Sequence, residues 1–353
     1  IGVALLLLAI IGGGYVEEMG LANALTLSHE TLVICLVVYG FVASILPVWM
    51  LLTPRDYLST FMKVGVIVLL AVGLVLAAPV LQNEAVTDFA TNGEGPVFAG
   101  KLFPFVFITI ACGALSGFHA LIASGTTPKM VAKESQVRMI GYGGMLMESF
   151  VAISALIAAS VIDQGIYFSM NASAGATGGT PETAAAFVNG LGFSITPADL
   201  EAAAASVEES IISRTGGAPT LAFGMSLIFT EAFGGGLAAF WYHFAIMFEA
   251  LFILTAVDAG TRVGRFMLQD TIGNVWKRYA DTSWRPAAWS ASALVVLVWG
   301  YMLWIGVGDP LGGINQLFPF FGIANQLLAA IALTLATTLL IKHGKLKWAW
   351  VPG

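Results

Sequence analysis

Hydrophobic residues recur along this chain in long blocks separated by shorter polar segments. The blocks cover, in order, residues 1–14, 31–52, 64–80, 102–124, 139–162, 238–258, 287–307 and 319–341. Crossing the hydrocarbon core of a membrane as a helix takes about 20 apolar residues, and most of the blocks approach this length. Backbone polar groups find no water in that core, so such a block adopts a helix. The pattern therefore predicts an all-α, polytopic bundle of transmembrane helices.

Composition supports a chain that lies in a lipid bilayer. Of the 353 residues, 58% are hydrophobic and only 10% are charged, whereas a soluble domain carries about 25% charged residues. This excludes an ordinary soluble enzyme, a disordered chain and a nucleic-acid-binding protein. Cys35 and Cys112 both lie in apolar blocks. They form neither a disulfide framework nor a zinc-binding spacing, and no metal or cofactor is expected.

The charges divide between the two sides that alternating blocks would create. Of the 15 basic residues, 13 fall on one side, in segments 53–63, 125–138 and 261–286 and in the tail. The other side receives 13 of the 21 acidic residues. Cytoplasmic loops carry the excess of Lys and Arg, so we expect the basic segments and the C-terminus to be cytoplasmic.

Two segments between blocks 139–162 and 238–258 need separate interpretation. Residue 217 is predicted outside and residue 261 inside, so block 238–258 supplies the single crossing between them. The short apolar block 218–230 is then re-entrant, interfacial or half of a broken helix; the alternative is an amphipathic helix on the outer surface. Segment 163–217 is interpreted as an outer loop with a short Ala-rich helix near 197–210.

Acidic residues inside apolar blocks are the first functional candidates. There are four at such positions: Glu148, Glu231, Glu249 and Asp258. Glu148 lies nine residues into its block, about 14 Å deep, and Glu249 is similarly deep. Either could carry a proton during transport, or could instead hold neighbouring helices together by hydrogen bonds. Asp258 precedes Arg262 by four residues, a spacing typical of a local ion pair.

The run from Cys112 to Lys129 changes from apolar to rich in Gly, Ser and Thr. Glycines permit a helix to unwind, and the freed backbone groups and hydroxyls can then bind an ion or a carboxylate. The alternative is a helix-packing surface of small residues with one satisfied histidine. The candidate substrate-binding residues in this run are Gly113, Ser116, Gly117, His119, Ser124, Thr126 and Thr127. His119 could also relay protons near neutral pH.

The amide pair Asn325–Gln326 interrupts the last apolar block. Within lipid these amides need partners, so they could bind substrate or clasp a neighbouring helix. No phosphate-binding loop, nucleophile elbow or zinc-protease motif is found, which argues against ATP-driven transport and against an enzyme.

Several long runs resemble the carbon starvation protein A (CstA) family. They include Leu46–Trp49 with Pro54–Leu58, Cys112–Met130, Ile140–Glu148, Gly216–Ala222, Trp241–Phe252, Asp258–Arg262 and Phe321–Ala330. The likeness covers nearly the whole chain except the segment around 163–213.

The resemblance implies a multi-pass transporter of the bacterial inner membrane that acts in carbon starvation. The family is described as taking up peptides, with some members importing pyruvate together with protons. It is grouped with the amino acid–polyamine–organocation superfamily, which implies discontinuous helices. Family members extend further at the N-terminus. Residues 1–165 would then complete an N-terminal transmembrane region, 166–217 would be an outer loop, and 218–353 would form the C-terminal region.

The combined prediction is a secondary active transporter that imports short peptides or a small carboxylate such as pyruvate with protons. Residues 113–127, with Asn325 and Gln326, would line the substrate site. Glu148 or Glu249 would carry the proton, supported by His119. The alternatives are a passive channel, or a membrane sensor or scaffold that contacts its partner through segment 261–286.

Overall fold

The computed structural model describes residues 2–20, 22–47, 49–103, 117–125, 127–309 and 314–353. Within these ranges the chain is helical and contains no strand. The longer helices are α1 (Gly2–Glu18), α3 (His29–Ile45), α4 (Leu52–Ala77), α10 (Gly144–Val161), α15 (Gly217–Phe233), α16 (Ala238–Gly273), α17 (Arg285–Gly308) and α18 (Ile314–Lys342). The shorter ones are α2 (Ala22–Leu25), α5 (Phe89–Asn92), α8 (Gly117–Gly125), α9 (Thr127–Met130), α11 (Gln164–Asn171), α12 (Ala174–Thr177), α13 (Pro181–Gly190) and α14 (Pro197–Val207).

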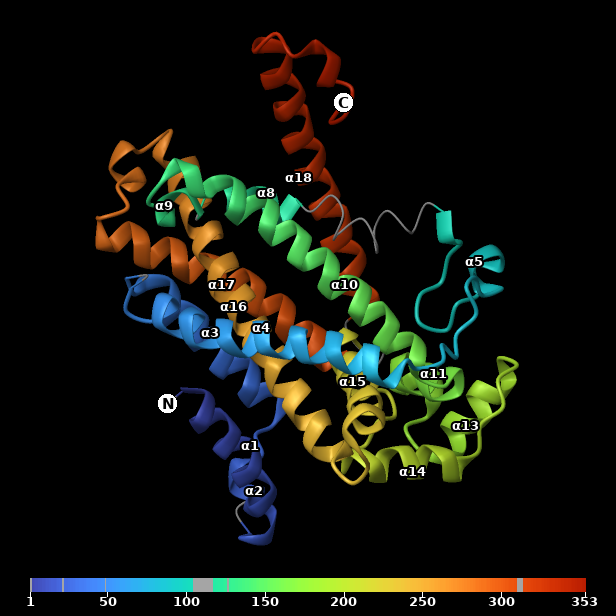
Figure 1. Cartoon of the computed structure of the whole chain (residues 1–353). Coiled ribbons are helices and arrows are strands. Elements are labelled where there is room, and N and C mark those ends of the chain that lie inside the picture. Colours follow the sequence, from blue (N-terminus) through green and yellow to red (C-terminus); the bar gives the residue numbers. More distant parts are fainter. Residues whose placement is uncertain (1, 21, 48, 104–116, 126, 310–313) are drawn as a thin grey trace.

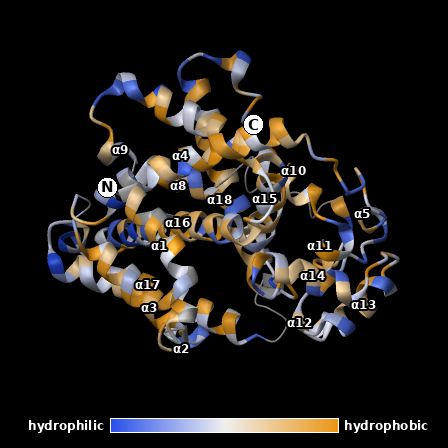
Figure 2. Ribbon diagram, turned by 60° about the horizontal axis from the view of Figure 1, so that its bottom comes forward, coloured by the Kyte–Doolittle hydropathy of each residue, from blue (hydrophilic) through white to orange (hydrophobic). Residues whose placement is uncertain are grey.

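Five helical stretches among the described residues are long and apolar enough to cross a membrane. They are Thr53–Ala77, Glu134–Val161, Ala238–Gly273, Arg285–Gly308 and Leu317–Lys342. The 17-residue α3 is a shorter apolar helix. These helices are largely apolar in Figure 2, and hydrophilic residues gather in the connecting segments. The prediction of an all-α membrane bundle is thus confirmed.

Two predicted element boundaries were wrong. Segment 53–63, expected to be a linker, forms the first turns of α4, which begins at Leu52. Segment 261–273, expected to be loop, continues α16 as far as Gly273. Both errors have one cause, because charged residues end an apolar block without ending a helix. Most of the predicted crossing 102–124 falls on residues 104–116, outside the described part of the chain.

The short block 218–230 forms α15, which has the largest share of buried residues among the described helices of 17 or more residues. Helix α15 packs against α4, α10 and α16 (Figure 1). Phe223, Ile228 and Phe229 on α15 are at most 2% exposed. Gly224 faces the backbone of Ala158 on α10 so closely that no side chain would fit between the two helices. This burial argues against an exposed amphipathic helix on the outer surface. At 17 residues, α15 is about 26 Å long and shorter than a hydrocarbon core.

Segment 163–217 is a folded unit of four short helices, α11 to α14, rather than an open loop. The Ala-rich helix expected near 197–210 is confirmed as α14. Helices α13 and α14 each begin with a threonine cap followed by proline, at Thr180 and Thr196, and each has a reciprocal capping box. Val188 and Leu200 from this unit join the main core beside α15.

Helices α8 and α18 form a second contact region (Figure 1). Gly117, the first residue of α8, is buried against Asn325, Leu328 and Ala329 of α18. A β-carbon at position 117 would overlap the Asn325 carbonyl oxygen. Glycine therefore permits the close approach of these two helices. A π-helical turn at Met139–Gly143 precedes α10, whose Glu148 contacts His119 on α8.

Candidate functional site

A cavity of about 910 Å³ lies among α8, α9, the π-helical turn, α10 and α18. Its walls are mainly apolar, formed by residues such as Ile122, Val131, Ile140 and Leu333. Among them stand three titratable side chains, those of His119, Glu134 and Glu148. Small-molecule sites are typically apolar hollows of about 300–1,000 Å³ with a few polar groups. In size and lining, the cavity falls within the range of small-molecule sites.

His119 and Glu148 meet at this cavity. Nε2 of His119 on α8 lies 3.2 Å from Oε2 of Glu148 on α10. The two side chains are 57% and 47% exposed. They can share a proton: with the proton on the imidazole they form an ion pair, and with it on the carboxyl they remain hydrogen-bonded. The structure thus brings together two candidate proton-coupling residues that the sequence analysis placed on separate helices.

Asn325 holds α8 in place. Its Oδ1 accepts a hydrogen bond of 2.8 Å from the backbone N–H of Phe118. Asn325 is only 3% exposed. Of the two roles considered for this amide, the structure shows the helix clasp. Its effect is to fix the first turn of α8, and Phe118 immediately precedes His119. Gln326 is half-buried beside it on α18.

The remaining candidates of the Gly/Ser/Thr run lie in different surroundings. Thr127 lines the cavity. The exposed Ser124 donates its hydroxyl proton to the backbone carbonyl of Leu121, one turn earlier. Gly117 serves the α8–α18 contact. The other three candidates, Gly113, Ser116 and Thr126, lie outside the described residues.

The other acidic candidates lie elsewhere. Glu249 is half-buried on α16 and is not among the described residues that line the cavity. Glu231 is exposed near the end of α15. Of the two predicted proton carriers, Glu148 is therefore the one that borders the cavity. In the described ranges, no three His, Cys, Asp or Glu side chains are grouped closely enough to hold a metal ion.

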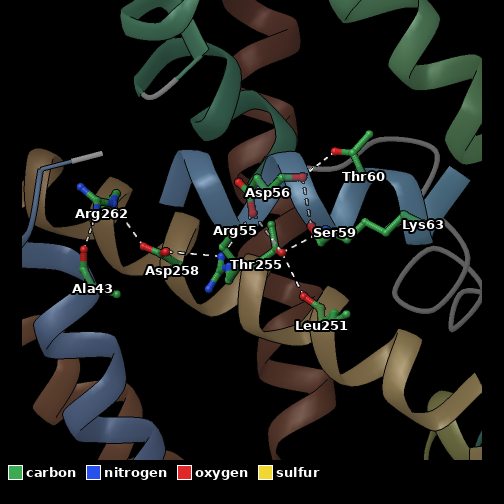
Figure 3. Close-up of polar contacts among 10 residues, drawn as sticks. All are labelled: Ala43, Arg55, Asp56, Ser59, Thr60, Lys63, Leu251, Thr255, Asp258 and Arg262. Carbon is green, nitrogen blue, oxygen red and sulfur yellow. Dashed lines mark hydrogen bonds and ion pairs between the residues drawn. The ribbon is translucent and has the colours of Figure 1, made fainter. Parts of the chain in front are cut away.

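A buried charge cluster joins α3, α4 and α16 (Figure 3). The predicted pair of Asp258 and Arg262 is confirmed, with Nε of Arg262 3.1 Å from Oδ1 of Asp258. Asp258 is completely buried and Arg262 is 1% exposed. Sequence reasoning missed Arg55 of α4, whose Nη2 lies 3.4 Å from the second oxygen of Asp258.

Arginines from α16 also bind the end of α3. Arg262 donates through Nη2 to the carbonyl of Ala43, and Arg265 donates through Nη1 to the carbonyl of Ser44. The last carbonyls of a helix lack intrahelical partners and carry partial negative charge. The two guanidinium groups provide these carbonyls with hydrogen-bond donors and with compensating positive charge. A second polar contact lies further along α4, where Nζ of Lys63 donates to Oγ1 of Thr255 on α16 at 3.0 Å.

A polar stripe on α4 could have revealed this cluster from sequence. Asp56, Ser59 and Lys63 recur at helical spacing just before the apolar block. That periodicity indicates a helix that starts before the hydrophobic residues do.

Comparison with protein families settles which family the chain belongs to. The model of the family described as carbon starvation protein CstA matches residues 1–353, the whole chain. The chain belongs to the CstA family. A CstA-family protein of Mycobacterium tuberculosis named peptide transporter CstA is 60% identical over 362 residues, covering 100% of this chain and 48% of that protein.

Two relatives from Escherichia coli K12 carry different functional names. The one named peptide transporter CstA is 58% identical, over 97% of this chain and 50% of its own length. The one named pyruvate/proton symporter BtsT is 48% identical, over 99% of this chain and 52% of its own length. The chain thus spans about half the length of these CstA-family relatives. No solved structure matched significantly.

Proposed function

We propose that the protein is a secondary active transporter of the bacterial inner membrane, which imports short peptides or a small carboxylate such as pyruvate together with protons. The observation that carries the proposal is the His119–Glu148 pair at the wall of the 910 Å³ cavity. The names of the relatives support both substrate classes and, for one relative, the proton.

In the proposed mechanism the cavity holds the substrate and Glu148 carries the proton. When Glu148 is ionised, His119 stabilises it as a hydrogen-bond donor. When Glu148 takes a proton, its charge is lost and the cavity wall becomes less polar. Substrate and proton are then carried together because the rearrangement that encloses Glu148 in apolar surroundings costs less when its carboxyl is neutral. The transport cycle is alternating access, with the basic loops and the C-terminus in the cytoplasm.

The proposal is tested by uptake into proteoliposomes that contain the full-length protein. Radiolabelled pyruvate and a radiolabelled dipeptide are each supplied, with the outside more acidic than the inside. We expect one of them to accumulate above its outside concentration and to saturate. A protonophore should abolish the accumulation.

Flux that neither saturates nor accumulates would instead identify a channel. No flux of either compound, with partner responses lost when segment 261–286 is replaced, would identify a sensor or scaffold. Either result would overturn the proposal.

A further inference from the structure

Arg55 is shared between two carboxylates on different helices. One nitrogen, Nη2, lies 3.3 Å from Oδ1 of Asp56 on its own helix and 3.4 Å from Oδ2 of Asp258 on α16. Its Nε and Nη1 atoms are buried and have no hydrogen-bond partner among the described residues. Arg55 also lies over the ring of Tyr39 on α3, 5.8 Å from the ring centroid, but each of its ion pairs is a single long contact and much of its hydrogen-bonding capacity is unused.

Arg262 is bound quite differently. It pairs with Asp258 on its own helix through Nε and with the carbonyl of Ala43 through Nη2. Figure 3 shows Asp258 between the two arginines, with Arg262 turned toward α3 and Arg55 reaching across from α4. The Asp258–Arg262 half of the cluster is anchored by shorter contacts, whereas the Arg55 half rests on longer ones, including a 3.4 Å hydrogen bond that Oγ1 of Thr255 on α16 donates to Oδ1 of Asp56.

This asymmetry allows the Arg55–Asp258 ion pair to break without leaving either side chain as an unpaired buried charge. Separating a buried ion pair is costly mainly when it leaves an uncompensated charge. If Arg55 moves away from Asp258, Asp258 keeps Arg262 and Arg55 keeps Asp56. Both states of the contact are therefore compensated, as a reversible switch requires.

The same turns of α16 support the helix that bears His119. Gly125 of α8 faces Val263, and Gly260 of α16 faces Phe118, so closely that an added β-carbon would touch at 3.7 and 3.4 Å. These contacts flank Arg262. A movement of this part of α16 relative to α4 would thus be transmitted to α8, and through it to the cavity wall.

We propose that the Arg55–Asp258 ion pair is a reversible latch between α4 and α16 that opens and closes in each transport cycle. The latch deepens the proposed function, on which it rests. Opening transfers Arg55 wholly to Asp56, and closing restores the bridge between the helices.

The latch is tested by measuring the distance between α4 and α16 in the full-length protein. Spin labels are attached at Tyr57→Cys and Ile253→Cys, both exposed positions, in a background without native cysteines. Pulsed electron paramagnetic resonance should give two distance populations. Arg55→Gln should increase the ratio of the longer to the shorter by about tenfold, which corresponds to about 1.4 kcal/mol. Arg55→Lys should restore most of the shorter population.

A second variant predicts the opposite sign. Asp56→Asn removes the negative charge that competes for Arg55, while its amide oxygen can still accept the hydrogen bond from Thr255 on α16, so the shorter population should grow. The matched control is Arg285→Gln, which alters an exposed arginine at the start of α17 and should leave both populations unchanged. A merely structural ion pair would give one distance in the unaltered protein and no shift with Asp56→Asn. Either of those results would overturn the latch.

The outcomes separate the latch from the proposed function. If uptake is proton-driven but neither Arg55→Gln nor Asp56→Asn changes the distance populations, the latch is refuted and the proposed function stands. Distances that shift in opposite directions in the two variants, in a protein that takes up neither pyruvate nor dipeptide, would support the latch and remove the proposed function.

Discussion

Polar side chains within the apolar helices bond neighbouring helices at several points. Asn325 binds the backbone of Phe118, and Lys63 binds Thr255. The hydroxyls of Ser44 on α3 and Ser292 on α17, both fully buried, lie 2.9 Å apart. Such interhelical hydrogen bonds contribute about 0.6–2 kcal/mol each in membranes. These side chains therefore determine which helices are neighbours and in which register.

Asn325→Ala should lower the stability of the full-length protein by about 1 kcal/mol, because the N–H of Phe118 loses its acceptor. It should also weaken proton-driven uptake, since the turn that orients His119 is no longer fixed. The measurement is the thermal unfolding midpoint in detergent, alongside uptake. Thr334→Ala is the control, because that exposed hydroxyl bonds Ala330 of its own helix. Equal midpoints for the two variants would refute the clasp.

The local part of the charge cluster was predictable from sequence and the rest was not. The spacing of four between Asp258 and Arg262 identifies their ion pair directly. Arg55 is about 200 residues away in the chain, and its pairing depends on how α4 and α16 cross. Likewise, His119 and Glu148 could be nominated individually from their apolar surroundings. Their contact depends on where the fold places α8 and α10 around the cavity.

At the scale of elements, hydrophobic length predicted where the helices are but not which of them is central. The block 218–230 was too short to be read as a crossing, yet α15 is the most buried of the longer helices in the described ranges. The length of an apolar block indicates how much apolar surface must be removed from water. Whether a helix is buried among its neighbours depends on small residues that permit close approach. The contact of Gly224 with Ala158 is an example. The high glycine content indicated close helix packing but not which helices would pack closely.

Gly224→Ala should destabilise the protein by about 1–3 kcal/mol, since the new methyl group would overlap the backbone of Ala158. Gly65→Ala on α4 is the matched control because nothing lies within 4 Å of its added β-carbon. That substitution should leave stability unchanged or raise it slightly, as alanine favours a helix over glycine. Denaturation midpoints of both variants provide the measurement. A Gly224→Ala protein as stable as the control would contradict the α10–α15 contact.

At the scale of the whole molecule, charge distribution predicts an orientation in the membrane. Helix α16 has 36 residues and is about 54 Å long, which exceeds a hydrocarbon core of about 30 Å. Apart from Glu249, its charged residues, Asp258 to Asp270, lie in the C-terminal half. The buried cluster would thus lie near the cytoplasmic membrane surface. There the latch could respond to movement of the basic loops.

This orientation predicts which positions a membrane-impermeant maleimide can reach. Glu94→Cys and Arg214→Cys should be labelled in right-side-out vesicles. Lys277→Cys and Lys345→Cys should be labelled only in inverted vesicles. The reason is the excess of Lys and Arg in cytoplasmic loops. Labelling of Glu94→Cys and Lys277→Cys from the same side would refute the predicted topology.

The central claim is that Glu148 carries the proton that drives transport, and one measurement tests it most directly. Full-length protein with Glu148→Gln is assayed in proteoliposomes for substrate counterflow and for accumulation driven by an acidic exterior. Glutamine imitates the protonated carboxyl, so we expect counterflow to persist while pH-driven accumulation falls at least tenfold, by about 1.4 kcal/mol or more. Glu249→Gln, which alters a glutamate away from the cavity, should retain both activities. Unchanged pH-driven accumulation in Glu148→Gln would contradict the account.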